Sequence, residues 1–176
     1  MEITQIVFQI ALILVPAGAV LMTAVYFMRR ESEKEMRSAQ IELKKERQKF
    51  FLPNRVDAYQ RAILLMERIH PNSLIMRHNN PGLPAAAMQM TLLEAIRSEY
   101  EHNIAQQMFI SQPTWEMVRK AKDETVKIVH LAGQQLDTTA TAMDLSAKVF
   151  EIVGEIGEMP TEIAVKALKE EVQSLF

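Results

Sequence analysis

A chain of 176 residues has room for one modest domain and one further segment. Its net charge of −2 at pH 7 argues against a nucleic-acid partner recognised by overall charge, and the absence of cysteine excludes disulfides and thiolate metal sites. Five glycines and no long Ser/Pro/Gly run argue against flexible linkers, while Leu, Ile, Ala, Met, Glu, Lys, Arg and Gln dominate. Because these residues favour helices, we expect an all-α protein.

The first stretch of the chain is strongly apolar. No charged residue lies between Ile6 and Met28, and a helix of these 23 residues would be about 34 Å long, enough for a hydrocarbon core of about 30 Å. We therefore expect residues 1–28 to be a transmembrane anchor. Arg29 and Arg30 follow directly, whereas only Glu2 precedes the stretch, so the positive-inside rule places the N-terminus outside the cytoplasm and residues 29–176 inside it.

Small residues gather in the middle of this stretch. Small side chains let a second helix approach closely in a membrane, and Ala19 and Thr23 are spaced as a small-xxx-small pair. We expect a contact with a partner helix at Ala17, Gly18, Ala19 and Thr23.

Residues 29–52 are predicted to form a charged helical stalk with eight basic and five acidic residues. Its first basic residues favour contact with anionic lipid of the bilayer or with a partner protein. Met36, Leu43 and Phe50 recur every seven residues, but the second position of the heptad is poor, so a long coiled coil is not supported and self-association stays an alternative. The expected lipid or partner contacts are Arg29, Arg30, Lys34 and Arg37.

Residues 53–176 read as a bundle of about five amphipathic helices. Pro53 is expected to end the stalk, and residues 70–84 are expected to form an irregular loop. In the helix expected over residues 140–156, the apolar stripe reads Met143, Ala147, Phe150 and Val153. The expected helices cover residues 55–69, 84–109, 114–136, 140–156 and 161–174.

One pattern in the bundle has metal-ligand spacing. Glu67 and His70, and again Glu99 and His102, are three residues apart, as in helical di-iron proteins. The pattern has only two fixed letters and His70 precedes a proline, so we assign no metal-binding residue. No nucleophile motif or phosphate-binding loop is present, and we assign no catalytic or cofactor-binding residue.

Two runs, Leu52–Pro71 and Glu99–Ser111, resemble an uncharacterised family of small proteins of Bacteroidota. The resemblance implies one N-terminal span in the bacterial inner membrane and a helical cytoplasmic domain, and it implies no activity.

We interpret the chain as a non-enzymatic accessory or adaptor subunit. It would bind other inner-membrane proteins in a multi-subunit complex through its span and its helical bundle, with no cofactor and no small-molecule substrate. One alternative is a membrane-tethered, di-iron-like metal enzyme. Another is a tether that engages the ribosome or nucleic acid through the basic stalk.

Overall fold

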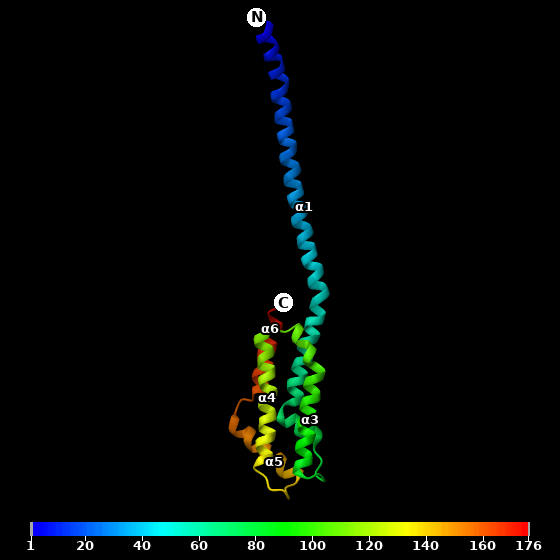
Figure 1. Cartoon of the computed structure of the whole chain (residues 1–176), viewed down its shortest axis with the longest axis vertical. Coiled ribbons are helices and arrows are strands. Elements are labelled where there is room, and N and C mark those ends of the chain that lie inside the picture. The colour runs from blue at the N-terminus through cyan, green and yellow to red at the C-terminus, as the bar shows by residue number, and fades with distance from the viewer. Residues whose placement is uncertain (1, 176) are drawn as a thin grey trace. The chain divides into compact units, whose positions relative to one another are not determined.

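The computed structural model describes residues 2–175, except the side chains of Glu2, Thr4, Ile6, Val7, Gln9, Ala11 and Ile13. Within that range the chain is all-helical, as predicted, with no strand and one isolated bridge between Pro84 and Thr141. It divides into two compact units, residues 1–51 and residues 52–176, which we call the N-terminal and C-terminal units. The elements are α1 (Glu2–Ile69), α2 (Pro71–His78), α3 (Ala85–Asn103), the 3₁₀ helix η1 (Ile104–Met108), α4 (Gln112–Gln134), α5 (Ala142–Ile156) and α6 (Pro160–Gln173) (Figure 1).

The expected transmembrane helix over residues 1–28 is not supported. A span needs about 20 consecutive, mainly apolar residues. In the part of the chain that the structure describes, no helix is both long and apolar enough to cross a membrane. Within the expected span, the side chains of Ile6, Val7, Gln9, Ala11 and Ile13 lie outside that part. We therefore correct the fold class to an all-helical protein without an assigned membrane anchor.

The expected helix end at Pro53 is also wrong, because α1 continues through this residue to Ile69. Proline removes one backbone donor, which frees the carbonyl of Lys49 one turn earlier. Lys49 and Pro53 both lie on exposed parts of α1, so water can satisfy that carbonyl.

Residues 70–84, expected to be irregular, contain the two-turn helix α2. Pro71 stands at its first turn, where the missing N–H costs nothing and the fixed φ angle favours the helix. The ring Nδ1 of His70 accepts a hydrogen bond from the Asn72 N–H at 3.3 Å. Leu74 and Ile75 are fully or almost fully buried, so α2 is held by packing as well as by its cap.

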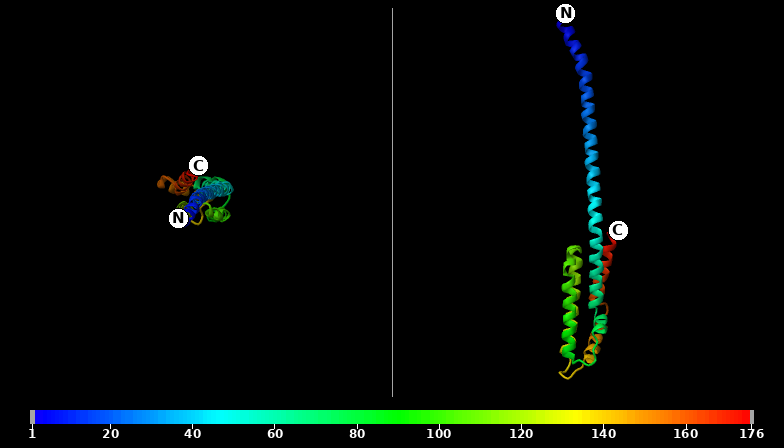
Figure 2. Two further views of the ribbon diagram at one scale, coloured as in Figure 1. Left: turned by 90° about the horizontal axis from the view of Figure 1, so that it is seen from above. Right: turned by 90° about the vertical axis from the view of Figure 1, so that its right-hand side faces the viewer.

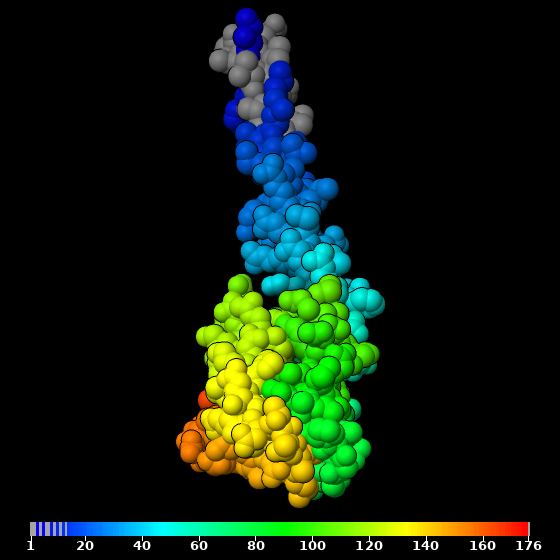
Figure 3. Space-filling model, turned by 60° about the horizontal axis from the view of Figure 1, so that its bottom comes forward, coloured from blue at the N-terminus to red at the C-terminus, as the bar shows by residue number. Residues whose placement is uncertain are grey.

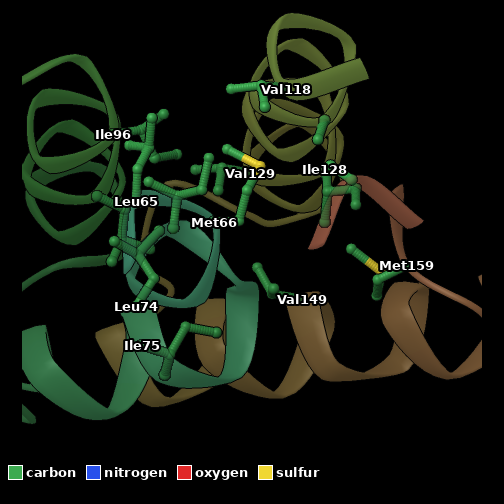
Figure 4. Packing of buried hydrophobic residues seen from close by; sticks show 14 of the residues in the cluster. Leu65, Met66, Leu74, Ile75, Ile96, Val118, Ile128, Val129, Val149 and Met159 are labelled. Carbon is green, nitrogen blue, oxygen red and sulfur yellow. The ribbon is translucent and has the colours of Figure 1, made fainter. Parts of the chain in front are cut away.

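The C-terminal unit is a helical bundle around one apolar core. α3 and α4 form an antiparallel pair, and α6 packs on α4 (Figure 1). The last turns of α1 lie beside α6 (Figure 2), where Tyr59 bonds to Glu171. α5 packs on α2, α3 and α4. Side chains from α1, α2, α3, α4 and α5 meet in the middle, together with Met159 just before α6 (Figure 4). The labelled members are Leu65, Met66, Leu74, Ile75, Ile96, Val118, Ile128, Val129, Val149 and Met159.

A polar cluster ties three elements of this bundle together at Glu171. Its carboxylate accepts hydrogen bonds from the Tyr59 hydroxyl at 2.7 Å and from the Ser111 N–H and hydroxyl at 3.0 and 2.8 Å. Burial raises the pKa of Tyr59 to about 12, helped by this bond to Glu171. Burial also tends to raise the pKa of Glu171, but hydrogen bonds from Thr114, Tyr59 and Ser111 outweigh it and hold that pKa below its usual value. The cluster therefore stabilises the bundle best with Glu171 ionised.

Candidate interaction surface on α5

Helix α5 has two apolar faces, and only one of them is buried. Ala142, Leu145, Ser146 and Val149 face the core, and Figure 4 shows Val149 pointing toward Val129 of α4. A second stripe at spacings of four, three and four residues follows the helical period on the outward side. It consists of Met143, Ala147, Phe150 and Gly154, all exposed, with Met143 at 55% and Phe150 at 39% of full exposure. We call these four residues the α5 outer face.

The position of α5 is fixed at both ends. At its start the Thr141 hydroxyl accepts from the Asp144 N–H, while the Asp144 carboxylate accepts from the Thr141 N–H at 2.8 Å, which completes a capping box. Two backbone bonds of 2.9 Å, from Ala85 to Ala140 and from Ala142 to Leu83, join this start to the segment before α3. At its end Gly157 has a φ of 78°, a value that favours glycine. The α5 outer face is therefore presented by a firmly seated helix.

Gly154 is the least expected member of this face. It lies inside α5, where glycine costs about 1 kcal/mol relative to alanine. A Cβ atom built at Gly154 would meet no other atom within 4 Å, so no packing inside this chain requires a glycine there. A glycine on an exposed apolar helix face allows the backbone of another chain to approach closely.

Acidic residues border the α5 outer face along one side. Asp144, Glu151 and Glu155 follow one another at spacings of seven and four, which places them on one edge of the helix. Lys148 pairs with Glu151 at 2.8 Å, and Glu155 is exposed. Figure 3 shows α5, coloured from yellow to orange, at the surface of the C-terminal unit. The surface combines apolar side chains with a negative border and suits a helix that carries apolar and basic residues.

A groove of about 510 Å³ lies between α3 and α4. Leu93, Ile96 and Val126 line its apolar part. Its central cation is already engaged, because the Lys122 ammonium pairs with Asp123 at 2.5 Å and lies 5.0 Å from the centre of the Tyr100 ring. Arg97, Glu101 and Asp123 also line the groove, so charges of both signs meet there.

The site residues expected from sequence all lie in the N-terminal unit, where every described side chain is exposed. Ala19 and Thr23 line a hollow of about 430 Å³, and the Thr23 hydroxyl donates to the Ala19 carbonyl at 2.8 Å, so it is satisfied within its own helix. Ala17 and Gly18 are exposed on the same helix, as are the basic residues Arg29, Arg30, Lys34 and Arg37.

The basic residues of the stalk have different surroundings. Lys34 lies 4.0 Å from Glu31. Arg37 lines a hollow of about 470 Å³ together with Lys44, Arg47 and the apolar Ile41. The contacts expected with lipid, with a partner helix or with a partner protein in the N-terminal unit stay predictions.

The structure does not bring the two Glu-x-x-His motifs together as a metal site. Glu99 accepts from Arg68 at 2.6 Å and lies 3.5 Å from Arg77, and the His102 Nδ1 is bonded to the Ser98 carbonyl. His70 caps α2, as described above, and Glu67 is exposed. Among the described residues, no three side chains of metal-binding type cluster. The di-iron alternative therefore has no site in the part of the chain that the structure describes.

A family model of unknown function, DUF7935, matches residues 5–175. The chain belongs to this family. The match covers both units and every helix described above, in agreement with the uncharacterised family expected from Leu52–Pro71 and Glu99–Ser111. No curated protein and no solved structure matches the chain.

Sequence reasoning placed α5 with the wrong side inward. Of the expected stripe, Met143, Ala147 and Phe150 are exposed and only Val153 packs partly against the core, while Leu145 and Val149 are buried. Both stripes have helical spacing, so the period alone could not choose between them. Gly154 gave no signal that separates the two stripes, because a glycine inside a helix indicates only a weaker helix at that position.

Proposed function

We propose that this DUF7935 protein is a non-enzymatic adaptor that binds a partner protein through the α5 outer face. One observation carries the proposal: a firmly capped helix presents Met143, Ala147, Phe150 and Gly154 together on its exposed side. Exposed, contiguous apolar surface of this kind is typical of protein–protein contacts. Methionine and phenylalanine are also common in such contacts.

The partner is expected to contribute an amphipathic helix. Its apolar side would pack against Met143 and Phe150, and Gly154 would let its backbone come close. Basic residues beside that apolar side would face Asp144, Glu151 and Glu155, and this charge complementarity would raise the association rate and fix the orientation.

Several finer expectations remain predictions. They are a source in Bacteroidota, a location at the bacterial inner membrane with residues 29–176 in the cytoplasm, and partners that are inner-membrane proteins of a larger complex. The adaptor role itself does not require a membrane span, because the α5 outer face belongs to the C-terminal unit.

The ribosome or nucleic-acid alternative rests on the exposed basic residues of the stalk. These alternate with five acidic residues, which weakens any continuous phosphate-binding track. A partner affinity that falls steeply as the salt concentration rises would favour this alternative over docking on the α5 outer face.

The experiment compares two exposed apolar residues changed to the same charge. The tagged full chain is purified from its own cells in mild detergent, and co-purifying proteins are identified by mass spectrometry. Phe150→Glu should lose a stoichiometric partner, whereas Met90→Glu on α3, 73% exposed, should retain it. The fluorescence of Trp115, the only tryptophan and one that is buried, verifies that both variants keep the bundle folded.

Two results would contradict the proposal. In one, the wild-type chain purifies without any stoichiometric partner. In the other, Phe150→Glu retains the partner as well as the wild type does.

A further inference from the structure

The N-terminal unit contains an uncovered apolar seam on its charged half. Met36, Leu43 and Phe50 recur every seven residues on α1, and each is more than half exposed. Because α1 runs without a break from Glu2 to Ile69, these three residues lie on one continuous helix. The same seven-residue step continues backwards to Arg29 and then to Met22 and Val15, which are also exposed.

The positions of this seven-residue step are the first seam position of each heptad. The second seam position lies three residues later, and its side chains are small over most of the N-terminal unit. Gly18, Val25, Ser32 and Ala39 occupy these positions, and Glu46 is the first long side chain among them. A heptad with large residues at one seam position and small residues at the other allows two helices to pack closely. Arg29, Ser32 and Glu46 are the polar residues of the seam, and polar residues at such positions favour a fixed register at some loss of stability.

The charges beside the seam favour a second copy in parallel, in-register alignment. In that arrangement the residue before a seam position faces the residue five positions later on the other helix. Glu42 then faces Arg47 of the second copy, twice by symmetry, and Glu35 faces Gln40. Glu46 inserts beside the same Arg47, so the one acidic seam residue also meets an opposite charge. None of these flanking pairs along residues 29–51 joins two like charges. Within the seam, the same alignment sets Arg29 against Arg29 and Glu46 against Glu46 of the second copy, which lowers the stability of the coil.

Among the described residues, neither Glu42 nor Arg47 forms an ion pair. The described residues of the stalk form one ion pair, between Glu31 and Lys34. Glu42 and Arg47 lie five residues apart on one helix, a spacing that does not bring them together within one copy. Their charges are therefore available to a second helix.

We propose that two copies associate through a parallel, in-register coiled coil of residues 29–51, with Met36, Leu43 and Phe50 in the seam and Glu42 paired with Arg47 across it. This association is separate from docking on α5, because the two surfaces lie in different units. It would present two α5 outer faces per assembly and would raise the avidity of the adaptor for a repeated partner.

The test uses the natural absence of cysteine. Leu43→Cys places a thiol in the seam, and Ile41→Cys places one on the opposite side of the helix, at nearly equal exposure of the native residues, 55% and 57%. The full chain in mild detergent is oxidised gently, and the disulfide-linked dimer is measured on a non-reducing gel. Leu43→Cys should cross-link strongly, and Ile41→Cys should give a several-fold lower yield.

Charge reversal tests the proposed pairing and its direction. Glu42→Arg should lower the cross-linking yield of the Leu43→Cys chain by placing like charges together, and adding Arg47→Glu should restore part of it. Lys45→Glu, which lies away from the seam, should leave the yield unchanged.

Three results would overturn the proposal. The first is a chain that sediments as a 20.1 kDa monomer. The second is equal cross-linking at positions 41 and 43. The third is a dimer in which Leu43→Cys does not cross-link, which would exclude the parallel register. Any of them would leave the α5 partner test intact, because that test reads co-purification and not self-association.

Discussion

The two ends of α1 show the same kind of residue in opposite surroundings. Between residues 3 and 51 every described side chain is exposed, including many large apolar ones. Between Ala58 and Ile69 the apolar side chains at helical spacing, such as Tyr59, Leu65 and Met66, are buried in the bundle core. An apolar side chain of α1 is therefore buried where other helices pack against it, and the apolar content of a segment alone does not decide its burial.

The two faces of α5 repeat this comparison within one helix. Its inner face is covered by α2, α3 and α4, and the residues of its outer face are exposed, Phe150 less so than Met143. An apolar surface left outside a folded bundle is available to a partner, whereas one inside contributes to stability. The following predictions test that division, from the largest expected effect to the smallest.

The first prediction compares the effect on stability of removing a leucine side chain at either end of α1. Leu65→Ala should lower the free energy of unfolding of the bundle by about 2–5 kcal/mol, because it leaves a cavity in the core. Leu21→Ala, at an exposed position, should change it by less than about 0.5 kcal/mol. Urea unfolding followed by Trp115 fluorescence reports on the C-terminal unit. A similar loss in both variants would mean that the N-terminal unit is part of the same cooperative core.

The second prediction concerns the polar cluster that ties α1 to α6. Glu171→Ala should destabilise the bundle by about 1–3 kcal/mol, because it leaves the buried Tyr59 hydroxyl and the Ser111 N–H without their acceptor. Glu170→Ala, exposed on the same helix, is the matched control and should cost less than about 0.5 kcal/mol. Equal effects in chemical unfolding would show that the Glu171 bonds contribute little.

The third prediction separates stability from binding on α5. Gly154→Ala should stabilise the bundle by about 0.5–1 kcal/mol, since alanine favours the helix and the added Cβ meets open space. The same change should weaken partner binding, because the partner loses its close approach. Thermal unfolding and co-purification measured on one preparation would check both effects. A stabilised variant with full binding would remove Gly154 from the proposed contact.

The fourth prediction is a pH dependence at the start of α5. The Thr141 N–H, and then the Thr141 hydroxyl, hold the pKa of Asp144 below its usual value. A lowered folded-state pKa means that the contribution to stability is complete above the unfolded-state value near 4 and is lost as the pH falls through the folded-state value. Asp144→Asn should therefore be less stable than the wild type at pH 7, and the difference should shrink toward pH 3. A constant difference over this range in unfolding midpoints would refute the assignment.

Several helices could be read from the sequence because their apolar residues form a single narrow stripe. Val118, Ala121, Val129 and Ala132 of α4 fall on one face by their helical spacing and are buried together. Tyr59, Ala62, Met66 and Ile69 of α1 behave in the same way. In such helices the period leaves only one face to bury, so local pattern and tertiary structure agree.

Other features could not be predicted because the sequence is compatible with two local structures or two buried faces. Pro53 forbids one backbone bond, but on an exposed turn that loss is small and α1 continues. Met90 and Met88 are both apolar residues of α3, and Ile163 and Val165 of α6, but the first of each pair is exposed and the second is buried. The residues expected to contact partners in the N-terminal unit are exposed, and their partners stay a prediction.

The sequence by itself determined that the protein is helical, where most of the helices lie and that the stalk is charged, because propensity and period are local properties. Only the tertiary structure decided which apolar face of α5 is buried and that Gly154 meets open space, because both depend on which helices pack beside α5. Which of two similar stripes is buried depends on the packing of the whole bundle, and the stripe left exposed is the surface that we propose for partner binding.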